Sequence, residues 1–398
     1  MRLRRFSLDL SKPLETASGA IREREGFLVA VRGSNGTEPG LGDDGDHDAA
    51  SAARETVWGV GEATPLPGWT ESLTSCESAL EAALEPDSQS AAGRPEPTAL
   101  DPASSPELGY SAVDAGGIDP ADAPAARHGF ALARDAAAAR GAGHALADRL
   151  AERVGFPTSA ESVPVNATVG DAPRDETVAA AERAVADGFD CLKVKVGARS
   201  LDADVERLCA VRDAVGSEIT LRADVNGAWD RATAARALTR LEPLDIAYVE
   251  QPLPAEDLAG TARLSGDSSV PIALDESLTA ASVETVLAAE AADVVVLKPM
   301  ALGGPDRAVA AAKRARERGV EPVVTTTVDA VVARTAAVHV AAAIPDVPAC
   351  GLATGALLAT DLGPDPCSVS DGQVSVPAGP GLAGDAFDDL VPSGAESE

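Results

Sequence analysis

Residues 191–197 read CLKVKVG, and the two lysines in this stretch decide how the rest of the chain is interpreted. Apolar residues alternate with Lys193 and Lys195, which is the pattern of a β-strand with one apolar face and one charged face. Ammonium groups in the middle of a buried strand would cost a large desolvation free energy, so we expect these lysines where the strand ends. The placement is selective, because the whole chain has only five lysines: Lys12, Lys193, Lys195, Lys298 and Lys313.

Seven further apolar runs repeat the pattern of a short strand followed by a helical segment. They are VPVNATV, EITLRADV, IAYVE, PIALDE, DVVVLK, EPVVTT and a weak run near Pro348. Eight such units between residues 163 and 350 predict an α/β fold with a TIM-type (β/α)8 barrel. A doubly wound open sheet is the competing arrangement, but no GxGxxG motif follows any of these strands.

Charged residues end the strands that follow Lys195. They are Asp224 in LRADVNG, Glu250 in AYVEQP, Asp275 in IALDES and Lys298 in VVVLKP. Consecutive members are 23 to 29 residues apart, close to the length of one strand–helix unit. Equivalent positions on neighbouring parallel strands lie at the same end of a barrel, where barrel enzymes carry their active sites. We therefore expect these side chains to converge on one pocket.

Three carboxylates beside lysines suggest metal-assisted proton transfer. Asp224, Glu250 and Asp275 are hard oxygen ligands suited to Mg²⁺, for which Mn²⁺ is a substitute. We expect a lysine near a divalent cation to have a lowered pKa, which suits it to act as a general base at neutral pH. A single Asp at a strand end is more often a helix cap or ion-pair partner, but that does not explain the full set at unit spacing.

Other candidate sites are weaker. The histidines lie in an acidic insertion or in helical patterns, which argues against a histidine metal cluster. Gly303 and Gly304 fit a helix-starting turn better than a phosphate cradle. Thr325 to Thr327 end the seventh strand, and the sequence leaves two roles open for them: hydrogen bonds to a substrate carboxylate, or helix caps.

The composition limits the partners and the environment. Lys+Arg of 33 against Asp+Glu of 63 give a net charge of −30, which disfavours nucleic acids and anionic membranes. High acidity with scarce lysine is typical of a salt-loving organism such as a halophilic archaeon. Five scattered cysteines without CxxC spacing predict reduced thiols. With no long apolar segment and a poor signal peptide, we expect a cytoplasmic protein.

These motifs resemble those of the enolase superfamily, in the muconate cycloisomerase-like branch with a KxK sequence on the second barrel strand. The matching stretches are KVK at 193–195, DVN at 224–226, EQP at 250–252, DES at 275–277 and KPMALGG at 298–304. The resemblance covers nearly the whole chain. It implies a modified (β/α)7β barrel and an enzyme that removes a proton alpha to a carboxylate with the help of Mg²⁺.

The resemblance also implies a division into three parts. Residues 1–160 are expected to form an N-terminal α+β capping domain, 161–350 the barrel with the active site, and 351–398 a C-terminal segment that returns to the cap. Within the cap we expect strands at 3–10, 26–32 and 56–62, helices at 71–84 and 125–153, a lid loop at 14–21 (LETASGAI), and acidic insertions at about 34–55 and 85–124.

Within this branch the sequence is most similar to o-succinylbenzoate synthases of menaquinone biosynthesis, lyases that dehydrate a succinyl-hydroxycyclohexadiene-carboxylate. TPLPGW and GLATGALLATDL, residues 351–362, carry this likeness. Dipeptide epimerases typically carry a DxD near the end of the eighth strand, which ACGLATG lacks. N-succinylamino acid racemases and muconate cycloisomerases stay open as alternatives, and a barrel that only binds ligands is less favoured.

The resemblance implies roles for individual residues. Lys195 would remove the α-proton and assist departure of the hydroxyl as water. Lys193 would support the developing negative charge, and Lys298 would act electrostatically from the opposite face or, in a racemase, as a second acid/base. Substrate contacts are expected from Asn226, Glu276, Thr325, Thr326, Thr354 and Gly355. The expected partner is a small carboxylate, no cofactor besides the metal is expected, and an oligomer is compatible with the sequence.

We expect folding and activity to require concentrated salt, because a net charge of −30 is tolerated when strong salt screens the repulsion between carboxylates. Circular dichroism and activity measured between about 0.1 and 3 M KCl would check this, with screening lengths of roughly 10 to 3 Å or less over that range. Full stability and activity in dilute buffer would contradict the expectation.

Overall fold

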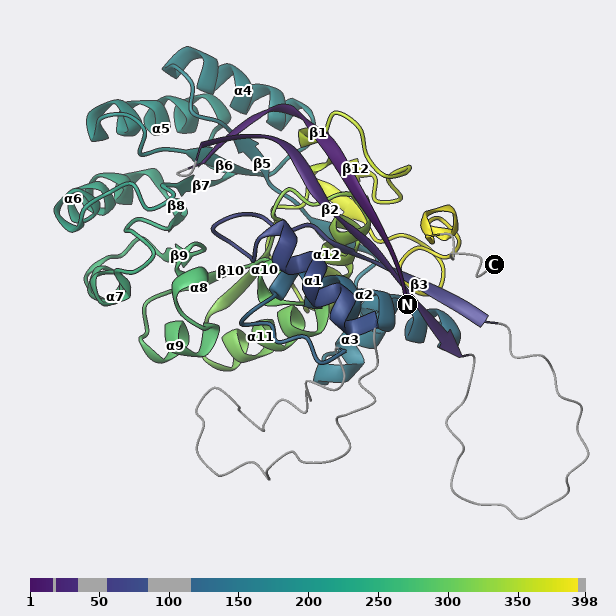
Figure 1. The fold of residues 1–398 in the computed structure, drawn as a ribbon. Coiled ribbons are helices and arrows are strands. Elements are labelled where there is room, and N and C mark those ends of the chain that lie inside the picture. The colour runs from purple at the N-terminus through teal and green to yellow at the C-terminus, as the bar shows by residue number, and fades with distance from the viewer. Residues whose placement is uncertain (17–18, 35–55, 85–115, 393–398) are drawn as a thin grey trace, which may run out of the picture.

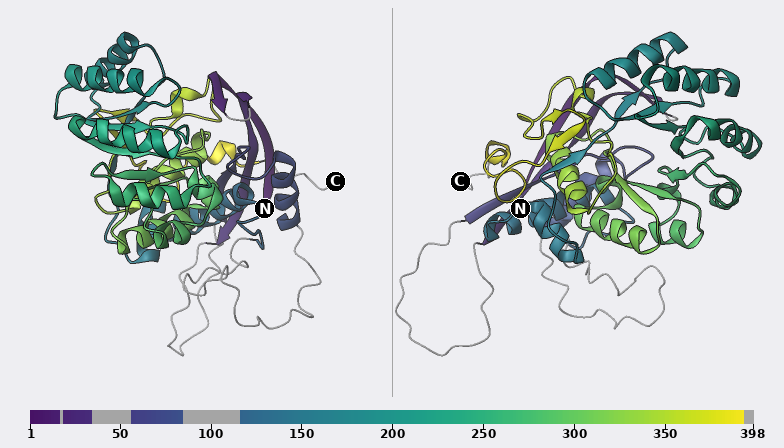
Figure 2. Two further views of the ribbon diagram at one scale, coloured as in Figure 1. Left: turned by 90° about the vertical axis from the view of Figure 1, so that its left-hand side faces the viewer. Right: turned by 180° about the vertical axis from the view of Figure 1, so that it is seen from behind.

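The computed structural model describes residues 1–16, 19–34, 56–84 and 116–392 (Figure 1). Most of both predicted acidic insertions therefore lies outside the described residues. The described chain forms an antiparallel N-terminal sheet with helices and a barrel of parallel strands, so the predicted α/β class with barrel and cap is confirmed. The cap lies against one face of the barrel (Figure 2).

The cap sheet has the strand order β1–β2–β3, with β1 at Arg2–Thr16, β2 at Gly19–Ser34 and β3 at Thr56–Ala63. All three predicted strands are present. The first two are longer than predicted because they continue into a hairpin in which Leu14 pairs with Ile21. The stretch expected to form a lid loop thus consists mainly of paired strand ends on either side of residues 17–18.

Three helices complete the described cap. They are α1 (Leu73–Leu84), α2 (Pro124–Ala142) and α3 (Leu146–Val154). The single helix expected at 125–153 is therefore wrong, because Gly143 ends α2 with a φ of 76°. This left-handed conformation is easily reached by glycine and commonly ends a helix. The chain resumes as a separate helix three residues later.

Seven parallel strands form one sheet in chain order. They are β5 (Ala167–Val169), β6 (Cys191–Lys195), β7 (Thr220–Asp224), β8 (Ile246–Glu250), β9 (Ile272–Leu274), β10 (Val294–Leu297) and β11 (Glu321–Val324). Cys350 and Gly351 close the barrel, because Cys350 bridges to Val165 and Gly351 bridges to Thr325. These two residues are the weak eighth run predicted near Pro348.

Helices follow the strands around the barrel (Figure 1). They are α4 (Arg174–Ala186), α5 (Leu201–Val215), α6 (Arg231–Leu241), α7 (Leu258–Asp267), α8 (Ser277–Ala280), α9 (Val283–Ala288), α10 (Pro299–Leu302), α11 (Pro305–Glu317) and α12 (Val331–Ala343). In the described chain no α-helix follows the eighth segment, as a (β/α)7β barrel requires.

The C-terminal segment runs back along the barrel to the cap. Its short strands, β12 (Val369–Ser370) and β13 (Gln373–Ser375), form a sheet with β4 (Ser162–Pro164). Leu358 bridges to Leu10 of the cap, and the carbonyl of Pro392 accepts a hydrogen bond of 3.0 Å from Arg2. The first strand of the cap is therefore in direct contact with the described end of the C-terminal segment.

Close packing between β3 and α2 depends on glycine. A Cβ added to Gly59 would lie 2.0 Å from the carbonyl oxygen of Ala133, and one added to Gly61 would lie 2.0 Å from that of Gly129. No side chain can be accommodated at such distances without moving the backbone of the helix. The two glycines therefore set how near α2 approaches the cap sheet.

The buried Glu62 of β3 ties the cap to the barrel. Its carboxylate accepts hydrogen bonds of 2.8 Å from the backbone N–H groups of Ala330 and Ala333, at the start of α12. Burial and repulsion by Asp329 raise the pKa of Glu62 to about 7, although these hydrogen bonds favour its charged form. Glu62 of the cap domain thus accepts hydrogen bonds from free N–H groups at the start of α12. The helix's own N-cap residue, Ala330, has no side chain that could do so.

Two further expectations concern the whole chain. All five cysteines are free thiols, and four of them are buried, as expected for reduced thiols. None of the helices in the described part of the chain combines the length and apolar character needed to cross a membrane.

Arg127 of α2 and Asp306 of α11 form a buried ion pair between cap and barrel. The Nη2 of Arg127 lies 3.0 Å from Oδ2 of Asp306, and the two side chains are 4% and 0% exposed. Burial opposes ionisation of Asp306, but the hydrogen bonds and charge of Arg127 outweigh it, so the pKa of Asp306 lies below its usual value.

We expect Arg127→Met to lower the free energy of unfolding by about 3 to 5 kcal/mol at neutral pH, because it leaves a buried carboxylate without its guanidinium. Since the pKa of Asp306 is depressed in the folded protein, the wild-type stabilisation is present above the unfolded pKa and is lost as pH falls through the folded pKa. Chemical denaturation in concentrated KCl at several pH values measures both effects. Arg231→Met, in an exposed pair with Asp257, is the matched control, and an equal effect there would contradict the prediction.

Candidate active site

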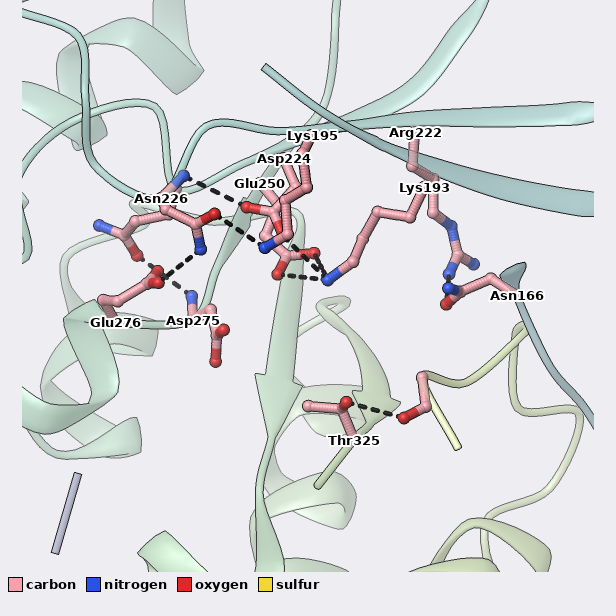
Figure 3. A network of polar contacts seen from close by, with 12 residues as sticks. Asn166, Lys193, Lys195, Arg222, Asp224, Asn226, Glu250, Asp275, Glu276 and Thr325 are labelled. Atoms are coloured by element: carbon pink, nitrogen blue, oxygen red, sulfur yellow. Dashed lines mark hydrogen bonds and ion pairs between the residues drawn. The ribbon is translucent and has the colours of Figure 1, made fainter. Parts of the chain in front are cut away.

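Parallel strand pairing brings the predicted charged residues to one level of the barrel. Lys195 of β6 pairs with Asp224 of β7, which in turn pairs with Glu250 of β8. Lys193, two residues before Lys195, shares the same inward face one layer deeper, beside Arg222. Figure 3 shows the side chains of Lys193, Lys195, Asp224 and Glu250 pointing toward one another, while Arg222 points toward Asn166. The register of three neighbouring strands therefore creates the cluster.

Each lysine of β6 contacts a carboxylate. The Nζ of Lys193 donates hydrogen bonds to both carboxylate oxygens of Glu250, at 2.9 and 3.0 Å, and lies 3.1 Å from Oδ2 of Asp224. The Nζ of Lys195 donates to the same Oδ2 of Asp224 at 2.6 Å and to Oδ1 of Asn226 at 2.7 Å. The side chain of Lys195 is 34% exposed, against 14% for Lys193. Lys195 is therefore the more accessible of the two ammonium groups.

Lys298 and Asp275 form a second charged pair on the far side of the cluster. The Nζ of Lys298 lies 2.6 and 2.5 Å from the two carboxylate oxygens of Asp275, and both residues are buried. The ammonium group also lies 3.3 Å from the centre of the Trp69 ring. Burial raises the pKa of Asp275, although the charge of Lys298 opposes this.

The charges of the cluster perturb one another. Burial disfavours ionisation of Asp224, but the ammonium groups of Lys193 and Lys195 prevail, so the pKa of Asp224 lies below its usual value. Burial and the charge of Asp224 raise the pKa of Glu250 to about 7. Burial acts to lower the pKa of Lys193, but the two carboxylates outweigh it and raise that pKa. We expect a lysine beside a divalent cation to have a lowered pKa. The neighbouring protein groups by themselves raise the pKa of Lys193 instead.

The carboxylates have the chemistry of a hard-cation site, but each of them faces a lysine. Within the described residues, no three His, Cys, Asp or Glu side chains come together as a metal-binding group. The two lysines of β6 form ion pairs with Asp224 and Glu250, and Lys298 forms one with Asp275. Because Asp224 raises the pKa of Glu250, a divalent cation shared between them would relieve their repulsion. The donor set therefore fits Mg²⁺, provided that the cation displaces lysine contacts.

Asn226 and Glu276 extend the polar network beyond the strand ends (Figure 3). The Nδ2 of Asn226 donates a hydrogen bond of 2.8 Å to Oε1 of Glu276, and its backbone N–H donates one of 3.2 Å to Oδ1 of Asp224. Both residues expected to contact substrate from the DVN and DES motifs are therefore connected to the cluster.

The threonines after β11 bond to protein groups. The hydroxyl of Thr325 donates to the carbonyl of Gly351 at 2.9 Å, and that of Thr326 lies 3.2 Å from the hydroxyl of Thr354. The N-cap position of α12 is held by Ala330, whose side chain makes no cap. A role for these threonines as caps of α12 is therefore wrong, and their contact with substrate stays a prediction.

Gly355 directly follows Thr354, and its contact with substrate stays a prediction. It begins a short 3₁₀ helix, η4 (Gly355–Leu357), and a Cβ added to it would lie 3.4 Å from Arg334 and from Asp365. It lines a cavity of about 450 Å³ together with Phe189 and Cys367. The contacts described for Gly355 therefore do not join it to the lysine and carboxylate cluster.

Two residues without an assigned role in the sequence analysis also shape the site. The side-chain oxygen of Gln251 accepts hydrogen bonds from the backbone N–H groups of Asp275 and Ser277, at 3.1 and 3.0 Å, and so fixes the end of β9 against that of β8. Trp69 covers Lys298 from the cap. Both lie in quoted motifs, EQP and TPLPGW, but nothing in the spacing indicated what they would touch.

The family is now clear from comparison with known proteins. A family model described as enolase C-terminal domain-like matches residues 176–388, which is more than half of the chain. The chain belongs to the enolase superfamily. It is therefore an enzyme of the enolase superfamily, and the alternative of a barrel that only binds ligands is set aside.

Curated relatives of this enolase-superfamily enzyme include several activities. An o-succinylbenzoate synthase of Thermobifida fusca (strain YX) is 44% identical over 221 residues, which cover 54% of the chain and 67% of the relative. A chloromuconate cycloisomerase of Cupriavidus necator is 34% identical over 238 residues, which cover 59% of the chain and 64% of the relative. The matched region thus spans about two thirds of the length of these relatives.

Solved structures of other superfamily members share the fold. The L-Ala-D/L-Glu epimerase of Bacillus subtilis, in a substrate-liganded complex, has a TM-score of 0.75 and 26% identity, covering 96% of this chain and 97% of its own. A dipeptide epimerase of Enterococcus faecalis V583, complexed with Mg and the dipeptide L-Leu-L-Tyr, has a TM-score of 0.75 and 24% identity, covering 96% of this chain and 98% of its own. The cap and barrel are therefore a shared architecture of these enzymes.

We expect Lys193→Met to lower the free energy of unfolding by about 3 kcal/mol at pH 8, because two buried carboxylates lose the ammonium group they share. The pKa of Glu250, already raised to about 7, should rise further, so the variant gains protons on folding and its deficit shrinks as pH falls toward the unfolded pKa. Added Mg²⁺ should stabilise this variant more than the wild type.

Urea unfolding in concentrated KCl at pH 5 and pH 8, with and without Mg²⁺, measures these effects. Lys313→Met is the matched control, since Lys313 lies outside the cluster and donates to the carbonyl of Val154. A deficit for Lys193→Met that is the same at both pH values would show that the carboxylates are not its cause.

Proposed function

We propose that this enolase-superfamily enzyme is a Mg²⁺-dependent o-succinylbenzoate synthase, a cytoplasmic lyase of menaquinone biosynthesis. The observation that carries the proposal is the difference between the two outer lysines. The side chain of Lys195 is 34% exposed, and one of its hydrogen bonds goes to the neutral amide of Asn226. The side chain of Lys298 is 10% exposed and lies between Asp275 and the Trp69 ring. A site with one accessible lysine suits a reaction that needs one base. The 44% identity to an o-succinylbenzoate synthase also supports the proposal.

The proposed reaction removes the elements of water from a succinyl-hydroxycyclohexadiene-carboxylate. Lys195, as the free amine, takes the proton from the carbon beside the carboxylate, and the resulting ammonium group returns it to the departing hydroxyl. The ring gains its third double bond, so hydrogen ion and hydroxide leave together as one water molecule. Lys193 lies beside the same carboxylates and stabilises negative charge that develops on the substrate.

Asp224, Glu250 and Asp275 are the residues that would hold Mg²⁺, or Mn²⁺ in its place. When bound, the cation supplies positive charge that stabilises an oxyanion beside the reacting carbon. The dipeptide epimerase that shares the fold was solved with Mg, which supports this proposal. Gln251 accepts a hydrogen bond from the backbone N–H of Asp275 and so helps to fix the position of this proposed ligand.

The remaining contacts concern substrate position. Asn226 contacts Lys195, and Glu276 bonds to Asn226; both are proposed to contact the polar groups of the substrate. Thr326 and Thr354 form a hydroxyl pair that could reorient toward a carboxylate. Strong salt screens distant acids within about 3 Å at molar ionic strength, so local lysines rather than the net charge of −30 would attract an anionic substrate.

A second candidate function is 1,1-proton transfer, as in an N-succinylamino acid racemase or a dipeptide epimerase. The observation that favours it is the position of Lys298, which directly follows β10, four strands along the barrel sheet from the β6 strand of Lys195, where a second acid/base would stand. The relatives include enzymes with epimerase, racemase and cycloisomerase names.

A spectrophotometric assay separates these functions: it follows the ultraviolet absorbance of the cyclohexadiene substrate, which falls as the substrate is dehydrated, in concentrated KCl. We expect turnover to depend on added Mg²⁺ and Lys195→Ala to lower kcat by at least about a hundredfold, because the base is removed. Lys313→Ala, at a distant partly exposed lysine, serves as the control and should leave turnover unchanged.

Absence of turnover from a folded protein that binds Mg²⁺ would contradict the synthase assignment. Exchange of the α-proton of N-succinylamino acids and dipeptides in D₂O then tests the second candidate. Exchange that needs both Lys195 and Lys298 would establish a reaction with two bases.

A further inference from the structure

Lys298 has two partners of different kinds. Its ammonium group contacts both oxygens of Asp275 and, at 3.3 Å, the centre of the Trp69 ring. At this distance the ammonium group lies directly on the ring face, where the negative potential of the aromatic system attracts a cation. Asp275 belongs to the barrel and Trp69 to the cap, so Lys298 is held from both domains.

A tight turn presents Trp69 in this position. The backbone N–H groups of Trp69 and Thr70 both donate to the carbonyl of Leu66, at 2.9 and 3.0 Å, and the hydroxyl of Thr70 accepts from the N–H of Leu66 at 2.8 Å. Gly68, just before Trp69, has a φ of 88°, a conformation that favours glycine. The turn that carries Trp69 is therefore closed by its own hydrogen bonds.

Arg24 fastens the base of this turn to the barrel. Its guanidinium donates to the carbonyls of Thr64 and Pro65, at 2.8 and 3.0 Å, and to that of Val328 at 3.2 Å. Arg24 is 2% exposed, and Val328, which follows β11, has a φ of 61° that is unusual for a β-branched residue. The buried side chain of Arg24 thus hydrogen-bonds to two turns at once. One is the cap turn before Trp69, and the other is the turn at Val328 at the barrel mouth.

The two partners of Lys298 differ in what happens to them when a divalent cation binds. Asp275 is a proposed ligand of Mg²⁺, and both of its oxygens now bond to Lys298. With a divalent cation bound there, the oxygens of Asp275 would be shared with it, and their hydrogen bonds to the ammonium group would weaken. The side chain of Trp69 has no oxygen ligand for Mg²⁺, so the cation–π interaction between its ring and the ammonium group of Lys298 does not compete with metal binding.

We infer that Trp69 is a positioning residue that keeps the ammonium group of Lys298 facing the site when a divalent cation occupies Asp275. The inference rests on the metal role given to Asp275 in the proposed function. Without the ring face, the long side chain of Lys298 is free to leave the position opposite Lys195. The cap thus controls a barrel residue through one aromatic contact.

Trp58 provides a matched control in the same domain. Its ring is contacted by two cations, with Arg2 at 4.4 Å and Arg32 at 5.2 Å from the ring centre. All three residues lie on the strands of the cap, and none of them contacts Lys298 in the contacts described. Trp58→Leu therefore removes the same kind of residue and interaction without removing the ring over Lys298.

The test is chemical labelling of lysines in the full-length protein with a small amine-acetylating reagent, in concentrated KCl with and without Mg²⁺. Peptide mass spectrometry resolves each position easily because the chain has only five lysines. With Mg²⁺ present, we expect Trp69→Leu to increase the labelling rate of Lys298 roughly fivefold or more, and Trp69→Phe, which keeps a ring face, to stay within about twofold of wild type. Lys313 provides the internal reference, and Trp58→Leu should leave Lys298 labelling unchanged.

An unchanged labelling rate of Lys298 in a cooperatively folded Trp69→Leu would overturn the inference. An equal increase in Trp58→Leu would also overturn it, by showing a general loosening of the cap. Kinetics give a second readout, since Trp69→Leu should lower kcat by roughly fivefold to tenfold with little change in KM, and Trp69→Phe should restore it. The labelling experiment needs no substrate. If the labelling rates change as expected but the protein does not dehydrate the cyclohexadiene substrate, the inference about Trp69 stands and only the proposed substrate is rejected.

Discussion

Three ammonium groups and three carboxylates share the mouth of this barrel, and neither set could be buried without the other. Removing one partner of a buried ion pair costs far more than an exposed pair contributes, so each carboxylate depends on the lysine that it contacts. Burial and the charge of Asp224 raise the pKa of Glu250, whereas Lys193 and Lys195 overcome burial and lower the pKa of Asp224, its neighbour on the adjacent strand. A divalent cation entering the site must therefore exchange with lysine contacts.

The cap participates in this arrangement through three side chains. Glu62 satisfies the N-terminus of α12, Arg24 joins the turn before Trp69 to the turn after β11, and Trp69 covers Lys298. Each contact joins an element of the cap to the end of the barrel where the charged residues gather. The position of a barrel lysine consequently depends on a domain that contributes none of the carboxylates.

Much of the fold and part of the site could be predicted because they follow from local periodicity. A strand alternates its side chains between two faces, so CLKVKVG fixed the direction of both lysines relative to their apolar neighbours. The spacing of the strand ends, close to one strand–helix unit each, predicted that Asp224 lies beside Lys195 and Glu250 beside Asp224. The extent of a helix could not be predicted in the same way, because Gly143 ends α2 at a point where the helical periodicity of the sequence continues.

The sequence by itself determined the barrel, the cap and the identity of the six charged residues, because these depend on strand period, unit length and motif. Only the tertiary structure decided which carboxylate each lysine faces, that Gln251 fixes the backbone of Asp275, and that Trp69 lies over Lys298. Those contacts join side chains that are distant along the chain or belong to different domains. Their geometry depends on how the domains pack and which rotamers that packing allows, and no spacing within a single segment specifies either.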